Sequence, residues 1–171
     1  MNLMAAAKKT APTPANDGHD ALISITRKYG FGEPDVRLRK DRLERSMKHP
    51  VEEIEAAFSL LSELLTTADT VQEKVALYFG MAEIVHLRGE DPAQPLLALH
   101  QTELGTYKDL GFRLVRVETS KDACPECKKL SGKVISIEEA LSSNILPHRA
   151  CKHDLKKGRG LCRCRFLAEF G

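Results

Sequence analysis

The feature that most constrains this 171-residue chain is the placement of its five cysteines, all of which lie after residue 120. The cysteines are Cys124, Cys127, Cys151, Cys162 and Cys164. An odd number of cysteines does not fit a fully paired disulfide framework, and clustered thiols in a reducing compartment are typical of metal binding. We therefore expect the C-terminal part of the chain to fold around a metal ion.

The best candidate ligand set consists of two pairs with the same spacing. Cys124 and Cys127 flank Pro-Glu, and His148 and Cys151 flank Arg-Ala further along the chain. Three sulfurs and one nitrogen make a complete tetrahedral set for Zn²⁺. A complete set leaves no open coordination position, so we predict one structural zinc ion and not a catalytic one.

Other donors leave this ligand set open. The second pair could instead be Cys162 and Cys164, and His153 is a further candidate ligand. A different interpretation of the first pair is a thioredoxin-like redox pair. That motif opens a helix within a βαβ unit, whereas the flanking residues here indicate a strand followed by a turn. Metal binding is therefore the preferred interpretation.

The part of the chain before Gly111 is predicted to be helical. Apolar residues recur there at helical spacing, and Gly, Asp and Pro separate the segments. His86 and His100 fall within these helices and are interpreted as surface or packed histidines. The predicted helices run from Ala21 to Tyr29, from Asp35 to Lys48, from Pro50 to Leu65, from an N-cap at Asp69 to Gly89, and from Asp91 to Gly111.

After Gly111 the pattern changes to short strands. Residues 112–118 and 133–135 are rich in β-branched residues, and residues 164–167 are a third candidate strand. Ser136 and Glu139 have the spacing of a capping box that opens a short helix. The sequence thus predicts an α+β protein with a disordered lead-in (1–18), an α-helical bundle domain (19–111) and a small zinc-stapled α+β module (112–171). So small a module needs its ion to stay folded.

Charge is distributed unevenly along the chain. From Phe112 onward there are 13 Lys and Arg against 7 Asp and Glu, and before it 13 against 17. A basic C-terminal part suggests an anionic partner or an acidic protein surface. Lys156, Lys157 and Arg159 could contact phosphates. Because no aromatic residue is interleaved to stack on bases, we interpret this loop first as a solvated one.

The compartment expected from the sequence is the cytosol. The N-terminal segment carries its lysines after a short apolar run, which is not the form of a secretory signal. No segment approaches the roughly 20 apolar residues of a membrane-spanning helix. We therefore expect no membrane association.

Short motifs between about residues 95 and 167 resemble a known family. In chain order they are Gln101-Thr102-Glu103, Tyr107, Gly111, FRLVRVETS, Asp122, CPEC, LSGKV, Pro147-His148 and a closing CRC. Together they resemble the head-morphogenesis domain of tailed phages, in the minor head protein family that includes protein F of phage Mu. Two features depart from that pattern. The family's compact His-Pro-x-Cys-Arg-Cys is opened here, and Gln101 stands where the family often has arginine.

The resemblance implies a site and a role. Cys124, Cys127 and His148 match metal-site positions of the family, and Cys162 and Cys164 match its closing motif. Family members are capsid-associated proteins that lie near the portal and help to assemble or fill the head. The resemblance therefore implies a non-enzymatic binding or assembly protein of a phage or prophage. It also implies a portal-like or capsid-like protein partner, a capacity to form oligomers, and a virion location if a phage encodes the chain.

The alternative from another class is a treble-clef or HNH-like metal-dependent nuclease, or a zinc module that binds nucleic acid. A nuclease needs a histidine general base beside an open metal site with oxygen ligands. His153 and Asp154 are the local candidates, but the expected downstream Asn and His pattern is missing. We therefore expect no enzymatic activity and assign no catalytic residue.

Overall fold

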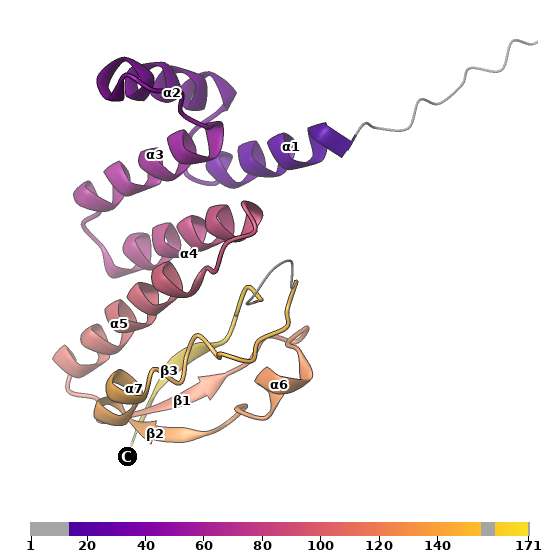
Figure 1. The fold of residues 1–171 in the computed structure, drawn as a ribbon. Helices are drawn as coiled ribbons and strands as arrows, with labels where there is room; N and C mark the ends of the chain where they lie inside the picture. Colours follow the sequence, from indigo (N-terminus) through magenta and orange to yellow (C-terminus); the bar gives the residue numbers. More distant parts are fainter. Residues whose placement is uncertain (1–13, 155–159, 171) are drawn as a thin grey trace, which may run out of the picture.

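The computed structural model describes residues 14–154 and 160–170, in which five helices precede a small sheet that carries two short helices (Figure 1). The α+β class predicted from the sequence is confirmed. In chain order the elements are α1 (Pro14–Arg27), α2 (Glu33–Met47), α3 (Glu53–Thr67), α4 (Val71–Leu87), α5 (Ala93–Asp109), β1 (Leu114–Glu118), α6 (Pro125–Lys128), β2 (Val134–Ser136), α7 (Ile137–Ser143) and β3 (Arg165–Glu169).

The first helix begins earlier than the sequence predicts. α1 starts at Pro14, within the predicted lead-in, and not at Ala21. Proline has no backbone N–H to donate, but the first turn of a helix does not need that donor, so Pro14 can open a helix. Residues 1–13 of the predicted lead-in lie outside the described part of the chain.

The start of α4 follows from capping chemistry. Thr70 Oγ1 accepts a hydrogen bond from the backbone N–H of Glu73 at 3.2 Å, and Glu73 Oε2 accepts from Thr70 N at 3.0 Å. The N-cap is therefore Thr70, one residue after the predicted Asp69. This reciprocal pair satisfies two N–H groups that the helix itself leaves without partners.

Two apolar cores lie on opposite sides of α4. The helical core contains buried side chains of α1 to α4, among them Leu61, Leu77 and Ile84. The module core contains Ala82 of α4 together with side chains of α5, the sheet and α7. Figure 1 accordingly shows α4 and α5 between the upper helices and the sheet. A helix that faces a core on each side must be apolar on both faces, as α4 is.

The sheet is antiparallel, in the order β2-β1-β3. Val115 of β1 lies opposite Ile135 of β2 and Ala168 of β3, and Val117 lies opposite Phe166. Helices α5 and α7 pack against this sheet. The three predicted strands are therefore present, with bounds shifted by one or two residues. In the structure α5 packs with the sheet, across the boundary predicted at Gly111.

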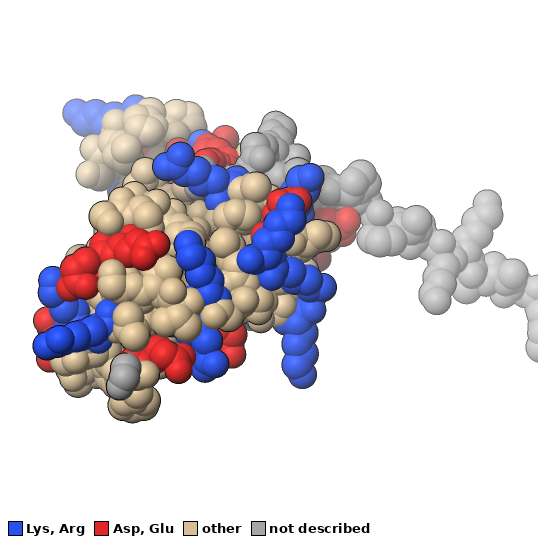
Figure 2. Space-filling view, turned by 90° about the horizontal axis from the view of Figure 1, so that it is seen from below, with Lys and Arg blue, Asp and Glu red and all other residues tan. Residues whose placement is uncertain are grey.

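The surface below the sheet carries charges of both signs. Figure 2 shows Lys and Arg interspersed with Asp and Glu on this face. Two cross-strand ion pairs contribute: Arg165 Nε lies 2.7 Å from Glu118 Oε2, and Arg116 Nε lies 3.1 Å from Glu169 Oε2. Each of these pairs joins a basic and an acidic side chain of neighbouring strands.

Among the described residues, no helix combines the length and the apolar character that crossing a bilayer requires.

Candidate metal centre

Three separate segments bring all five cysteines together. Within one group, the Sγ atoms of Cys124, Cys127 and Cys151 lie within 4.8 Å of one another. Within a second group, the Sγ atoms of Cys127, Cys162 and Cys164 also lie within 4.8 Å of one another. Cys127 belongs to both groups and is only 1% exposed. The cysteine cluster, meaning these five residues, could hold a metal ion.

The first segment presents its two thiols from a single turn of helix. Cys124 is the N-cap of α6, Pro125 occupies the first turn, and Lys128 N donates to Cys124 O at 3.0 Å. The sequence predicts a strand and a turn here, but the pair opens a helix. Local structure alone therefore does not distinguish a metal site from a redox pair. The three other thiols close to this pair favour the metal site.

The second and third segments are joined backbone to backbone. Gly160 N donates to Cys151 O at 3.0 Å, and Leu161 N donates to His153 O at 2.9 Å. A Cβ atom at position 160 would lie 2.6 Å from His153 O and 2.8 Å from Cys151 O. Only glycine fits this close approach, which brings the CRC segment (Cys162 to Cys164) beside Cys151. The requirement for glycine at 160 was not predicted from the sequence.

His148 lies at the edge of the cysteine cluster. Its Nδ1 is 3.9 Å from Cys127 Sγ, and its backbone oxygen accepts from Cys151 N at 3.0 Å. Of the four predicted ligands, the three cysteines form one group and His148 adjoins one of them. An imidazole in this position could complete the coordination of an ion that the thiols hold.

His153 is oriented toward a carboxylate. Its Nε2 lies 3.8 Å from Asp122 Oδ2, which also accepts a hydrogen bond from Arg163 Nη1 at 3.2 Å. These contacts join the segment after Cys151 to the end of β1 and the CRC segment. The predicted phosphate contacts, Lys156, Lys157 and Arg159, lie outside the described residues.

The pKa of Cys124 is lowered by backbone donors. Burial raises it, but hydrogen bonds outweigh burial and bring the pKa down to about 7. The foremost donor is the backbone N–H of Lys152, 3.3 Å from Cys124 Sγ, and those of Cys127 and Glu126 add to it. N–H groups that face a sulfur stabilise a thiolate, which is the form that binds metal.

The other thiols are shifted in the opposite direction. Burial, and then the nearby Cys162 thiol, raises the pKa of Cys127 far above its ordinary value. Hydrogen bonding to Cys162, and then burial, raises the pKa of Cys151. The pKa of Cys162 is also raised, because Cys164 and burial outweigh the lowering effect of Cys151. A coordinated cation reverses such shifts, since it stabilises each thiolate directly.

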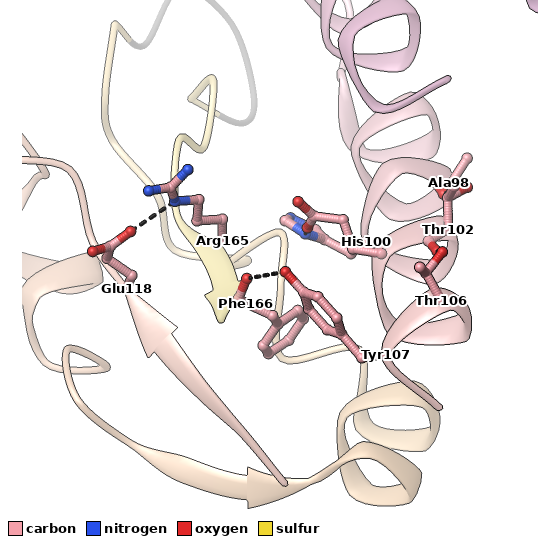
Figure 3. Close-up of polar contacts among 9 residues, drawn as sticks. Ala98, His100, Thr102, Thr106, Tyr107, Glu118, Arg165 and Phe166 are labelled. Carbon is pink, nitrogen blue, oxygen red and sulfur yellow. Dashed lines mark hydrogen bonds and ion pairs between the residues drawn. The ribbon is translucent and has the colours of Figure 1, made fainter. Parts of the chain in front are cut away.

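Figure 3 shows how β3, which follows the CRC segment, is fixed between α5 and β1. Tyr107 Oη donates to Phe166 O at 3.3 Å, and the His100 ring packs edge-on against the Phe166 ring at a centroid distance of 5.5 Å. Arg165 Nε donates to Glu118 Oε2 at 2.7 Å on the other side. The two cysteines that precede β3 are therefore held by the sheet as well as by the cluster.

A buried histidine links the helical part to the site. His86 of α4 is 3% exposed, and its Nε2 lies 3.4 Å from Asp154 Oδ2. Asp154 lies in the segment that follows Cys151 and adopts a left-handed backbone conformation (φ 49°). His86 is a packed histidine, one of the two roles expected from the sequence.

No protein-family model, curated protein or solved structure matches this chain.

The first prediction concerns Gly160. Gly160→Ala places a methyl group against two backbone segments, and overpacking of this kind costs about 1–3 kcal/mol. Because 1.4 kcal/mol is a factor of ten, the dissociation constant for Zn²⁺ should rise by about ten- to a hundredfold. Competition with a chromophoric chelator measures this constant.

The matched control is Gly18→Ala in α1, where an added Cβ meets nothing within 4 Å. It should bind Zn²⁺ like the unaltered protein. Equal affinities for all three proteins would contradict the role assigned to the backbone contact at Gly160.

Proposed function

We propose that this chain is a non-enzymatic binding or assembly protein whose C-terminal module is held together by zinc, in a role similar to that of phage minor head proteins. The observation that supports the proposal best is the convergence of five thiols from three segments on one place. The phage context comes from the sequence resemblance.

Zinc fits the donor set. Thiolate and imidazole are its preferred ligands in structural sites, whereas Mg²⁺ and Ca²⁺ prefer oxygen. The cluster offers Cys124, Cys127 and Cys151 as one group, with His148 beside it. An ion bound there would cross-link α6 to the segment that follows α7. Such an ion binds with about 10–16 kcal/mol in small zinc modules.

The strands of the module are short, so a metal cross-link would stabilise its fold. Its strands β1, β2 and β3 are only five, three and five residues long. Four of its cysteines are themselves part of the module core. A structural ion there supplies folding free energy that the short strands cannot supply alone.

A protein partner fits the exposed apolar side chains of the module. Phe170, beyond β3, is 85% exposed, Leu110 beyond α5 is 68% exposed, and Val134 of β2 is 47% exposed. The Phe170 ring also packs against the ring of Phe112, with a distance of 5.2 Å between the ring centroids. Aromatic residues are enriched at protein interfaces. The exposed Phe170 therefore favours a protein ligand, and the resemblance suggests a portal-like or capsid-like one.

A thiol redox function is the second candidate, favoured by the helix-opening Cys124 and its pKa of about 7. The two functions differ in the state of the purified protein. A zinc module holds metal and reduced thiols, whereas a redox pair forms a disulfide between Cys124 and Cys127 and exchanges it with small thiols.

The second prediction tests the metal. A zinc chelator should increase amide hydrogen exchange in β1, β2 and β3, while α2 and α3 keep their protection because the helical core contains no cysteine. Hydrogen exchange followed by mass spectrometry measures both regions in one experiment.

The control for this experiment is Cys124→Ser, which should show the faster exchange without any chelator. If exchange in β1 to β3 is the same with and without chelator, the metal does not hold the module together and this part of the proposal fails.

The third prediction tests assembly. On co-expression with the portal protein of the same genome, this chain should co-sediment with it, and Phe170→Glu should reduce the bound fraction by about tenfold, as for loss of an apolar interface contact. Met47→Glu is the matched control, because Met47 of α2 is 53% exposed but lies in the helical part.

Two results would contradict the assembly role. One is the absence of co-sedimentation, or of any portal gene in the genome. The other is cleavage of plasmid DNA with Mg²⁺ that is lost in His153→Ala, which would favour the nuclease.

A further inference from the structure

We propose that the cysteine cluster holds a second soft cation of the Zn²⁺ class, bound by Cys127, Cys162 and Cys164, with Cys127 bridging the two ions. This inference rests on the metal-stabilised module proposed above and concerns its stoichiometry. The observation behind it is that two groups of three mutually close thiols share one sulfur.

The number of donors exceeds what one ion can use. A tetrahedral ion takes four ligands. Cys124, Cys127 and Cys151 form one group, and His148, whose Nδ1 lies 3.9 Å from Cys127 Sγ, would be the fourth ligand. Cys162 and Cys164 remain, 1% and 4% exposed, with their Sγ atoms within 4.8 Å of Cys127 Sγ. Their spacing is that of ligands to a common ion and is not required for either thiol to pack as an apolar side chain.

Bridging is within the chemistry of a thiolate. A thiolate sulfur has more than one lone pair and can bind two soft cations at once, which a histidine nitrogen or an ammonium group cannot do. Cys127 is placed for this role, since it belongs to both groups and lies at the end of the rigid turn α6. Of the first pair, Cys127 has the more buried side chain, and Cys124 is only partly buried.

Charge permits a second cation. One divalent ion with the thiolates of Cys124, Cys127 and Cys151 leaves a charge of about −1, and two divalent ions with all five thiolates leave the same charge, so the second ion adds no unpaired buried charge. Among the described basic residues next to the cysteines, Arg163 is directed to Asp122, and Lys152 contributes its backbone N–H to Cys124.

The two ions should differ in affinity. The first has four protein donors, whereas Cys127, Cys162 and Cys164 leave the second ion one ligand short of four. A site with three protein ligands keeps a position for an exchangeable ligand. The second ion should therefore leave first when the holoprotein is titrated with chelator.

The test is native mass spectrometry of the full chain reconstituted with Zn²⁺ or Cd²⁺. The unaltered protein should carry two ions and Cys164→Ser one. Cys127→Ser should carry at most one ion, held more weakly than in Cys164→Ser, because this change removes a ligand from both groups. Ala140→Ser is the matched control: it adds a hydroxyl to the same core at a residue 3% exposed, and it should keep both ions.

The second measurement examines the bridge itself. In the protein loaded with ¹¹³Cd, two cadmium resonances should appear and should be coupled to each other through the shared sulfur. Two uncoupled resonances would overturn the bridge. Because this readout uses the unaltered chain, it does not depend on whether Cys127→Ser folds.

The outcomes separate this inference from the proposed function. One ion in both the unaltered protein and Cys164→Ser would overturn the second site and leave the zinc-held module standing. Two ions in Cys164→Ser would remove Cys164 from the ligand set and would also overturn the inference. No ion in any protein would overturn both proposals.

Discussion

The close approach of thiols around Cys127 is the contact on which the C-terminal module depends. Burial and mutual proximity raise the pKa values of Cys127, Cys151 and Cys162, so these three thiols resist ionisation as long as no cation stabilises their thiolates. A soft cation changes the sign of this interaction, because sulfurs that repel one another as thiolates are all attracted to it. The arrangement is therefore unfavourable for free thiolates and favourable for metal ligands.

Helix α4 joins the helical part of the chain to the module. α4 contributes Ala82 to the module core and Leu77 and Ile84 to the helical core, and α4 and α5 pack along their lengths. His86 extends this continuity to the segment after Cys151 through Asp154. α4 therefore joins the two cores, whereas the buried side chains of α2 and α3 belong to the helical core.

The sequence predicted those features that depend on local chemistry. The period change after Gly111, the three strands and the Ser136 cap all follow from residue type and spacing, and Ser136 Oγ does accept from Glu139 N at 3.0 Å. The clustering of cysteines was visible because a metal site needs donors in short, regular spacings. Local chemistry also explains the error at α1, because Pro14, which falls within the predicted disordered lead-in, occupies the first turn of the helix, where proline is accepted.

Features that depend on tertiary contact could not be predicted in this way. The packing of α5 on β3 brings together Tyr107 and Phe166, which are 59 residues apart. The close backbone approach at Gly160 is likewise set by contacts that no periodicity reveals. The choice among candidate ligands has the same origin, because spacing leaves both His148 and the pair Cys162 and Cys164 as candidates, and only the fold places them around Cys127. The position of Gly160, two residues before Cys162, was a local signal for the close backbone approach.

X-ray absorption at the zinc edge, on protein purified without chelator, tests the central claim most directly. A first shell dominated by sulfur at about 2.3 Å is the result predicted for an ion held by the cysteine cluster. A shell of oxygen and nitrogen at about 2.0–2.1 Å, or no bound zinc in a protein whose module is folded, would contradict it.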